Sequence, residues 1–204
     1  MQKIVRRVLI CLMIWVFFWS LNVIMDRKAL NQNLIRFHVV ANSDTQEDQL
    51  IKLQVRDAVL QSLKQDLESV GDIALARQYI MDNLAKIQDA ANDTLKQLGV
   101  ADRTTVTFCK EQFPMRIYDT FALPAGIYES LRITIGQGDG KNWWCVAFPM
   151  LCIPATTEGF ANTAAGAGFS TALVHTLSGA PEYQFRFLLL DALGELDCKF
   201  YPKS

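Results

Sequence analysis

The sequence lacks an excess of charge of either sign, any internal repeat, and the short motifs of several large enzyme classes. Its 204 residues carry 20 basic and 21 acidic side chains, so the overall charge gives no indication of nucleic-acid binding. No P-loop, G-x-S-x-G or H-E-x-x-H motif occurs. Only two histidines are present, too few for a convincing zinc site with Cys145 and Cys152. We therefore expect no metal, no cofactor and no catalytic residues.

The N-terminal segment differs from the rest of the chain. Residues 1–30 carry five basic side chains and one acid, and residues 8–25 form an apolar run in which only Ser20 and Asn22 are clearly polar. As a helix this run would extend about 27 Å, just short of a hydrocarbon core of roughly 30 Å. The residues after Trp19 offer no A-x-A-like cleavage site, which favours an uncleaved signal anchor over a cleaved signal peptide. The positive-inside tendency places the N-terminus in the cytoplasm and the body outside it.

After this segment, residues 1–25, we expect a short polar tether at 26–34 and then a single exported α+β domain at 35–204. The β-branched and aromatic residues of 35–40 predict its first strand. Further strands of a mainly antiparallel sheet are expected where apolar and polar residues alternate, at 106–108, 113–117 and 131–135, and again at 143–148.

Two long amphipathic helices are expected between the first strand and the later ones. Ser43 and Gln46 have the spacing of a capping box, which predicts a helix that ends at Gly71. Asp72 can cap a second helix, in which apolar residues recur at steps of three or four as far as Gly99. Because both helices have broad apolar faces, we expect an antiparallel pair packed on the sheet.

Three glycines within residues 136–140 would suit a phosphate-binding loop only if a helix followed them. A strand is expected there instead, so the segment predicts a hairpin turn. Residues 154–182 are rich in Ala, Gly, Ser and Thr, which is typical of a flexible loop. Residues 183–190 predict a strand, and residues 191–200 a short closing helix.

Four of the five cysteines lie in the expected exported body. Cys145 and Cys152 are seven residues apart, so a disulfide between them requires the chain to double back, which Pro149 can initiate. Either this bridge forms in an oxidising exterior, or both cysteines are buried thiols. A catalytic cysteine paired with His38 or His175 is a further alternative, but neither cysteine lies in a recognised nucleophile turn.

Two blocks of the sequence carry a family resemblance. They are residues 36–44, RFHVVANSD, and residues 142–149, NWWCVAFP, which are followed by Cys152. Together with LPAGIY at 123–128 between them, these blocks resemble stage II sporulation protein R over about residues 35–153. One departure is Met150, where the family tends to have a second proline.

The resemblance implies a protein made in the forespore of an endospore-forming bacterium and exported into the space between the two cells. There it would activate a membrane-embedded aspartic protease of the mother cell, which cleaves the pro-form of the sporulation sigma factor sigma-E. We therefore expect a non-enzymatic signalling protein that contacts this protease and, through residues 8–25, the membrane. The alternatives are an exported cysteine hydrolase that uses Cys145 or Cys152, and a membrane-tethered structural module.

Two segments are expected to form or support the surface that contacts the partner. One is the loop after the first strand, and the other is the aromatic pair on the last strand, whose two side chains point to opposite faces. A structural role in the turn is the alternative for the loop, and burial within the fold is the alternative for the aromatic pair. The residues concerned are Asn42, Ser43, Asp44, Trp143 and Trp144.

Overall fold

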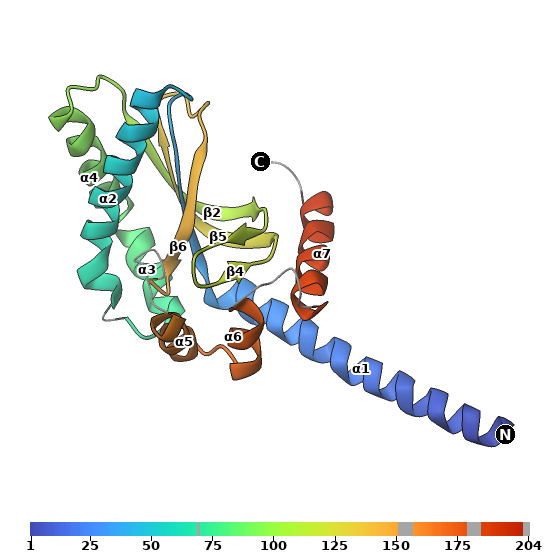
Figure 1. The fold of residues 1–204 in the computed structure, drawn as a ribbon. Helices are drawn as coiled ribbons and strands as arrows, with labels where there is room; N and C mark the ends of the chain where they lie inside the picture. The colour runs from blue at the N-terminus through green and yellow to red at the C-terminus, as the bar shows by residue number, and fades with distance from the viewer. Residues whose placement is uncertain (69, 151–156, 179–184, 202–204) are drawn as a thin grey trace.

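The structure is a computed structural model that describes all residues except 69, 151–156, 179–184 and 202–204 (Figure 1). It confirms an α+β fold with an N-terminal apolar helix. In chain order the elements are α1 (Gln2–Asn33), β1 (Ile35–Val40), α2 (Gln46–Glu68), α3 (Ile73–Asp82), α4 (Leu84–Gln97), β2 (Thr104–Phe113), β3 (Arg116–Ile117), β4 (Ala122–Leu123), β5 (Gly126–Ile135), β6 (Asn142–Phe148), α5 (Thr157–Gly166), α6 (Thr171–Leu177) and α7 (Phe185–Phe200).

A four-stranded mixed sheet forms the centre of the fold, in the order β2-β5-β1-β6. β1 pairs in parallel with β5, whereas the β1–β6 and β2–β5 pairs are antiparallel. Because β5 and β6 flank β1 on opposite sides, residues 136–141 cross the end of β1. The predicted hairpin turn is therefore wrong, and we call residues 136–141 the crossing loop. β3 and β4 form a separate two-stranded ribbon.

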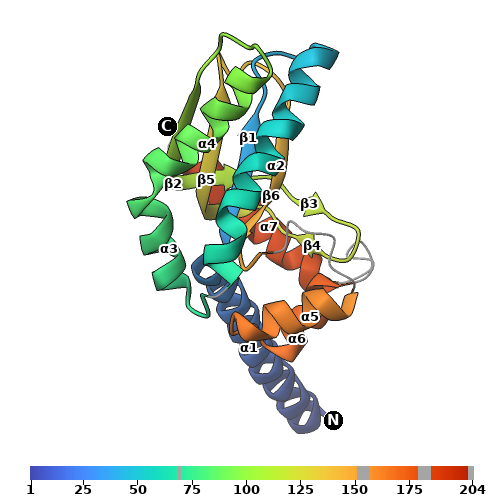
Figure 2. The same cartoon turned by 90° about the vertical axis from the view of Figure 1, so that its left-hand side faces the viewer.

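One face of the sheet, here called the first face, is covered by α2, α3 and α4 (Figure 2). Ile35, Phe37 and Val39 of β1 point toward these helices and are fully buried, as expected from period-two alternation. Asp72 is confirmed as a helix cap, since its carboxylate accepts the backbone N–H groups of the following turn. The second predicted helix is broken at Asn83 into α3 and α4.

The opposite face, here called the second face, packs against the end of α1 and against α5, α6 and α7. Figure 1 shows α1, α6 and α7 on the side of the sheet away from α2 and α4, with α5 below the end of β6. The predicted loop at 154–182 and strand at 183–190 are therefore wrong where the chain is described. Small residues serve close packing here: a Cβ on Gly194 would lie 1.6 Å from the carbonyl oxygen of Ala125. Phe187 and Leu190 are buried one helical turn apart in α7.

α1 continues through residues 26–33, which the sequence predicts as a tether. Val23, Asp26 and Leu30 recur at steps of three and four and are buried against the body, so this part of the helix belongs to the fold. Residues 1–18 are exposed and extend away from the body (Figure 1). By length and composition α1 can cross a membrane, a property that it shares with N-terminal signal sequences.

Candidate functional site

A row of four side chains crosses the second face of the sheet. Strand register places Thr107, Arg132, His38 and Trp144 side by side on β2, β5, β1 and β6. Side chains at these positions share one face because their neighbours along each strand point to the other. His38 is buried, whereas the other three are partly exposed. We call these four residues the polar row.

Aromatic and cationic groups stack at the β6 end of the polar row. The rings of His38 and Trp144 are stacked, with centroids 4.8 Å apart and planes only 2° from parallel. The guanidinium carbon of Arg116, from β3, lies 4.9 Å from the centre of the Trp144 ring. This is the geometry of a cation–π contact. The guanidinium of Arg116 forms no salt bridge with any described residue.

Glu111, on β2, joins the polar row by two charge-assisted hydrogen bonds. It accepts one from Nε2 of His38 at 2.8 Å and one from Nη1 of Arg132 at 2.7 Å. Burial alone would raise the pKa of Glu111, but the hydrogen bond from His38 and the nearby positive charges outweigh it and hold the pKa below its usual value. Glu111 is therefore a stable acceptor for two members of the row.

Arg36 lies beneath the polar row and is fully buried. Its Nη2 donates to the hydroxyl of Tyr118 at 3.1 Å, and its guanidinium carbon lies 4.5 Å from the ring centre of Phe113 and 5.2 Å from that of Tyr128. Burial raises the pKa of Tyr118 despite the positive charge of Arg36, so the tyrosine stays neutral. The charge of Arg36 is thus met by aromatic faces rather than by a carboxylate among the described residues.

Hydrogen-bond donors outnumber acceptors on this face. Several buried nitrogen atoms that donate hydrogen bonds have no partner within the described chain; they are Nε and Nη1 of Arg36, and Nε of Arg116 and Arg132. Nδ1 of His38 is also unpaired, but it is an acceptor in a neutral ring that donates through Nε2 to Glu111. Of the three arginines, only Arg132 forms a salt bridge in the described part of the chain. The surroundings of the polar row are therefore positively charged and contain several unmatched donors.

The two tryptophans lie on opposite faces, as the sequence predicts. Trp144 is part of the polar row, whereas Trp143 lies on the first face and packs edge-to-face on Phe37, with centroids 6.0 Å apart. Arg56 of α2 covers Trp143, with its guanidinium carbon 4.7 Å from the ring centre. Helix α2 therefore covers Trp143 but not Trp144.

The loop after β1 has a clear structural function. Oδ1 of Asn42 accepts the backbone N–H of Gln137 at 3.0 Å, and Oδ1 of Asp44 accepts that of Lys141 at 2.7 Å. These bonds hold the crossing loop over the end of β1. The hydroxyl of Ser43 bonds instead to Asp48 in the first turn of α2, and this bond lowers the pKa of the Asp48 carboxyl. A contact between this loop and a partner remains a prediction.

The predicted capping box is wrong. The backbone N–H of Asp48 donates to the hydroxyl of Thr45 at 3.2 Å, so Thr45 rather than Ser43 caps the start of α2. The side chain of Ser43 is not available for this, because it bonds to the carboxylate of Asp48. The helix itself begins at Gln46, as expected from the acidic residues of its first turn.

The cysteine positions do not support a Cys145–His38 dyad. Cys145 is 3% exposed and packs in the apolar cluster of the first face, whereas His38 points to the second face. The sheet therefore separates the two side chains. Cys145 is not a free thiol, but Cys152 lies outside the described residues, so their pairing stays a prediction. Cys109 is free and shares the face of His38, yet burial and the charge of Glu111 raise the pKa of its thiol.

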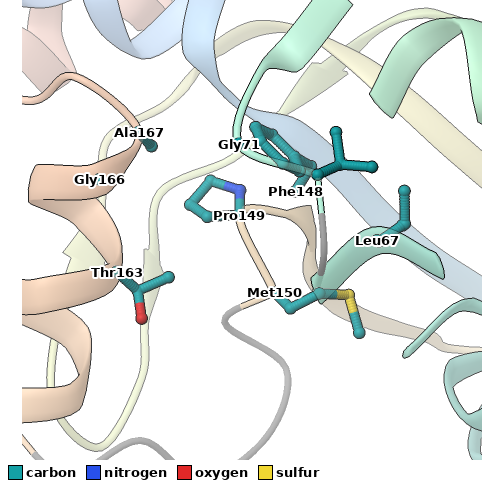
Figure 3. Close-up of a pocket in the computed structure, with 9 residues that line it drawn as sticks. Leu67, Gly71, Phe148, Pro149, Met150, Thr163, Gly166 and Ala167 are labelled. Carbon is teal, nitrogen blue, oxygen red and sulfur yellow. The ribbon is translucent and has the colours of Figure 1, made fainter. Parts of the chain in front are cut away.

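A pocket of about 290 Å³ lies where α2, β6 and α5 come together. Figure 3 shows Thr163 and Ala167 on one side of it and Leu67 and Met150 on the other. It offers no acid or base, because its described lining residues include no titratable side chain; they are Leu67, Val70, Gly71, Phe148, Pro149, Met150, Thr163, Gly166 and Ala167. Groups of three or more metal-ligating residues are also absent from the described part of the chain.

The fold and the site define an α+β domain behind an apolar N-terminal helix, with a cluster of arginines around the polar row of its sheet. Residues 31–158 match the family described as Stage II sporulation protein R, and because this is more than half of the chain, the protein belongs to that family. Stage II sporulation protein R of Bacillus subtilis (strain 168) is 41% identical over 118 residues, which are 58% of this chain and 53% of that protein. The chain thus spans about half the length of this relative. No solved structure matches it.

The polar row lies entirely within the matched residues, but of its members only Trp144 was named from the sequence as a candidate for partner binding. The alternation in β1 already placed Arg36 and His38 together on the face opposite Phe37. The sequence therefore contained a signal for this site, because Arg36 and His38 face the same way in a strand whose other residues are apolar. The partners Glu111 and Arg132 needed the strand order, because they lie on strands remote in sequence.

Proposed function

We propose that this protein is an exported signalling protein of sporulation, which binds a membrane-embedded aspartic protease of the mother cell and thereby promotes cleavage of pro-sigma-E. The observation that carries the proposal is the family match over residues 31–158, which contains the central sheet and the polar row. The family name supports the role in sporulation. The identity of the partner and of the cleaved sigma factor rests on the resemblance of the sequence blocks to this family.

The N-terminal helix supports a route out of the forespore cytoplasm. Three basic residues precede its apolar run, which favours an N-terminus in the cytoplasm and a body in the space between the two cells. Within the run, Ser20 and Asn22 donate to backbone carbonyls four residues earlier, at 2.8 Å each, so their polar groups are satisfied inside the helix. The burial of Val23 and Leu30 against the body favours an anchor that is retained.

Activation on this proposal is a binding event without chemistry in the signalling protein. A ligand shifts its receptor toward an active state only if it binds that state more tightly than the inactive one. The bound surface must therefore be held rigidly, and the sheet provides this because its strands are packed on both faces.

The test is to express the chain, the cognate protease and pro-sigma-E together in a host that does not sporulate, and to follow cleavage by immunoblotting. We expect cleavage only when all three proteins are present. A chain that lacks residues 8–18, which are exposed and outside the folded body, serves as the matched control that is not exported. Cleavage in the absence of the chain, or equal cleavage with a protease whose catalytic aspartate is changed to asparagine, would rule the proposal out.

A further inference from the structure

On each face of β6 an arginine packs over a tryptophan, but the two pairs have different surroundings. Arg56 lies over Trp143 and Arg116 lies over Trp144, at 4.7 and 4.9 Å from the ring centres. The first pair is formed by a helix that covers the sheet, and Arg56 also bonds to Asp57. The second pair is formed by a two-residue strand, and Arg116 has no salt bridge to a described residue.

We propose that the polar row and Arg116 form the surface through which this protein docks on an acidic segment of its protein partner. This inference rests on the proposed function and specifies the chemistry of its binding site. Arginine and tryptophan are the residue types that contribute most often to the energy of protein interfaces. Here they lie together on one sheet face, partly exposed, beside a buried and rigid His38.

Charge complementarity defines the occupant. Arg116 and Arg132 are partly exposed and can meet a partner, whereas Arg36 is fully buried beneath them and adds only to the positive potential. Glu111 is the carboxylate that forms a salt bridge with Arg132 in the described part of the chain. The side chain of Arg132 is 39% exposed, and only its Nη1 bonds to Glu111. Carboxylates match free guanidinium groups, because they can accept two parallel N–H bonds from one arginine. An Asp- or Glu-bearing segment of the partner is therefore the ligand that this surface fits.

The aromatic component favours a protein over a free anion. Trp144 lies between the parallel ring of His38 and the guanidinium of Arg116, and its ring centre is 5.0 Å from that of Phe113. A tryptophan fixed in this way offers apolar area at little cost in side-chain entropy. A free anion would use the guanidinium groups alone, whereas a peptide segment can place a carboxylate on Arg116 and an apolar side chain against the part of Trp144 that stays exposed beside His38 and Arg116.

The test uses the full chain with the cognate protease and pro-sigma-E, and compares Arg116→Glu with Arg56→Glu. We expect Arg116→Glu to reduce both processing and co-purification with the protease by at least about tenfold, and Arg56→Glu to change them by less than about twofold. Arg116→Ala should give an intermediate loss. Thermal melts show whether the variants fold. If Arg116→Glu does not, Arg116→Ala decides the matter, and wild-type processing and co-purification by a folded Arg116→Ala would then overturn the proposal.

Salt and vesicles provide the second arm of the experiment. Co-purification of the wild-type chain should weaken as ionic strength rises, since the contacts are partly exposed charges. A set of Asp→Lys and Glu→Lys changes on the extracytoplasmic side of the protease should include one that restores processing by Arg116→Glu. If Arg116→Glu loses binding to vesicles of anionic phospholipid but still binds the protease, the surface binds lipid and the inference is wrong.

The two proposals fail in different ways. If the wild-type chain does not promote processing, the proposed function itself is wrong. If the wild-type chain does so and Arg116→Glu does so equally, the function stands but the polar row is not the docking surface.

Discussion

Asp26 on α1 and Arg186 on α7 form a largely buried ion pair between residues 160 positions apart in the chain. Nε of Arg186 lies 2.7 Å from Oδ2 of Asp26, whose side chain is 8% exposed. The pair connects the N-terminal helix to the C-terminal helix across the second face of the sheet. The helix that carries the apolar run is therefore fixed to the body instead of being joined to it by a flexible segment.

The first prediction concerns this ion pair. Asp26→Asn should lower the free energy of unfolding by about 3 kcal/mol, because it leaves the Arg186 charge without its partner in a largely buried site. Urea denaturation of the full chain in detergent measures the change. Asp57→Asn is the matched control, since Asp57 is 64% exposed and its ion pair contributes at most about 1 kcal/mol. Equal effects of the two changes would mean that the end of α1 is not part of the folded unit.

The second prediction concerns the crossing loop. A Cβ on Gly140 would lie 2.3 Å from the carbonyl oxygen of Ser43, so the backbone there approaches too closely for a side chain. Gly140→Ala should therefore destabilise the protein by about 1–3 kcal/mol, as overpacking does. Gly71→Ala is the control, because a Cβ there meets no atom within 4 Å. Thermal denaturation of both variants decides the matter, and a Gly140→Ala protein as stable as the control would contradict the loop path described above.

The third prediction is a pH dependence of stability. The folded-state pKa of Glu111 lies below its usual value, so its contribution is present above the unfolded-state pKa of about 4.3 and is lost as the pH falls through the folded-state pKa. The free energy of unfolding of the wild-type protein should thus fall more steeply below about pH 4.3 than that of Glu111→Gln. Glu47→Gln, at an exposed position in the first turn of α2, should keep the wild-type slope. Parallel slopes for all three proteins would show that Glu111 is not held ionised by the polar row.

The fourth prediction separates a disulfide from a catalytic thiol. Cys145→Ser and Cys152→Ser should destabilise the protein to the same extent, by about 2.5 kcal/mol, if the two cysteines are bridged. Cys109→Ser should have little effect, because this thiol is free and exposed. Denaturation with and without reductant measures the difference. A loss of signalling at only one of the two positions, with unchanged stability, would instead indicate a nucleophile.

Local patterns allowed the first half of the domain to be predicted well. Alternation fixed the faces of β1, and Asp72 and Gly99 marked helix boundaries, because these signals depend on neighbours close in sequence. The C-terminal part was predicted badly for a related reason. Its Ala- and Gly-rich composition suggests a loop, but small residues also occur where backbones pack closely, as at Gly194, and composition alone does not distinguish the two.

The candidate site, too, was predictable from local patterns only in part. The pattern of β6 was enough to place Trp143 and Trp144 on opposite faces, since successive strand residues alternate. Which of them lies under a helix depended on α2, and the hydrogen bonds of Glu111 depended on β5 lying between β2 and β1. Neither relationship has a local signal.

Residue order within short windows was enough to predict the apolar N-terminal helix, most of the strands and helices of residues 35–135, and the family. Three features became evident only from the folded chain: α1 is part of the body, β1 lies between β5 and β6, and Arg36, Arg116 and Arg132 gather around the polar row, where Glu111 forms a salt bridge with Arg132. These features arise from strand order and helix docking, where contacts join residues far apart in the chain and are selected by burial and charge.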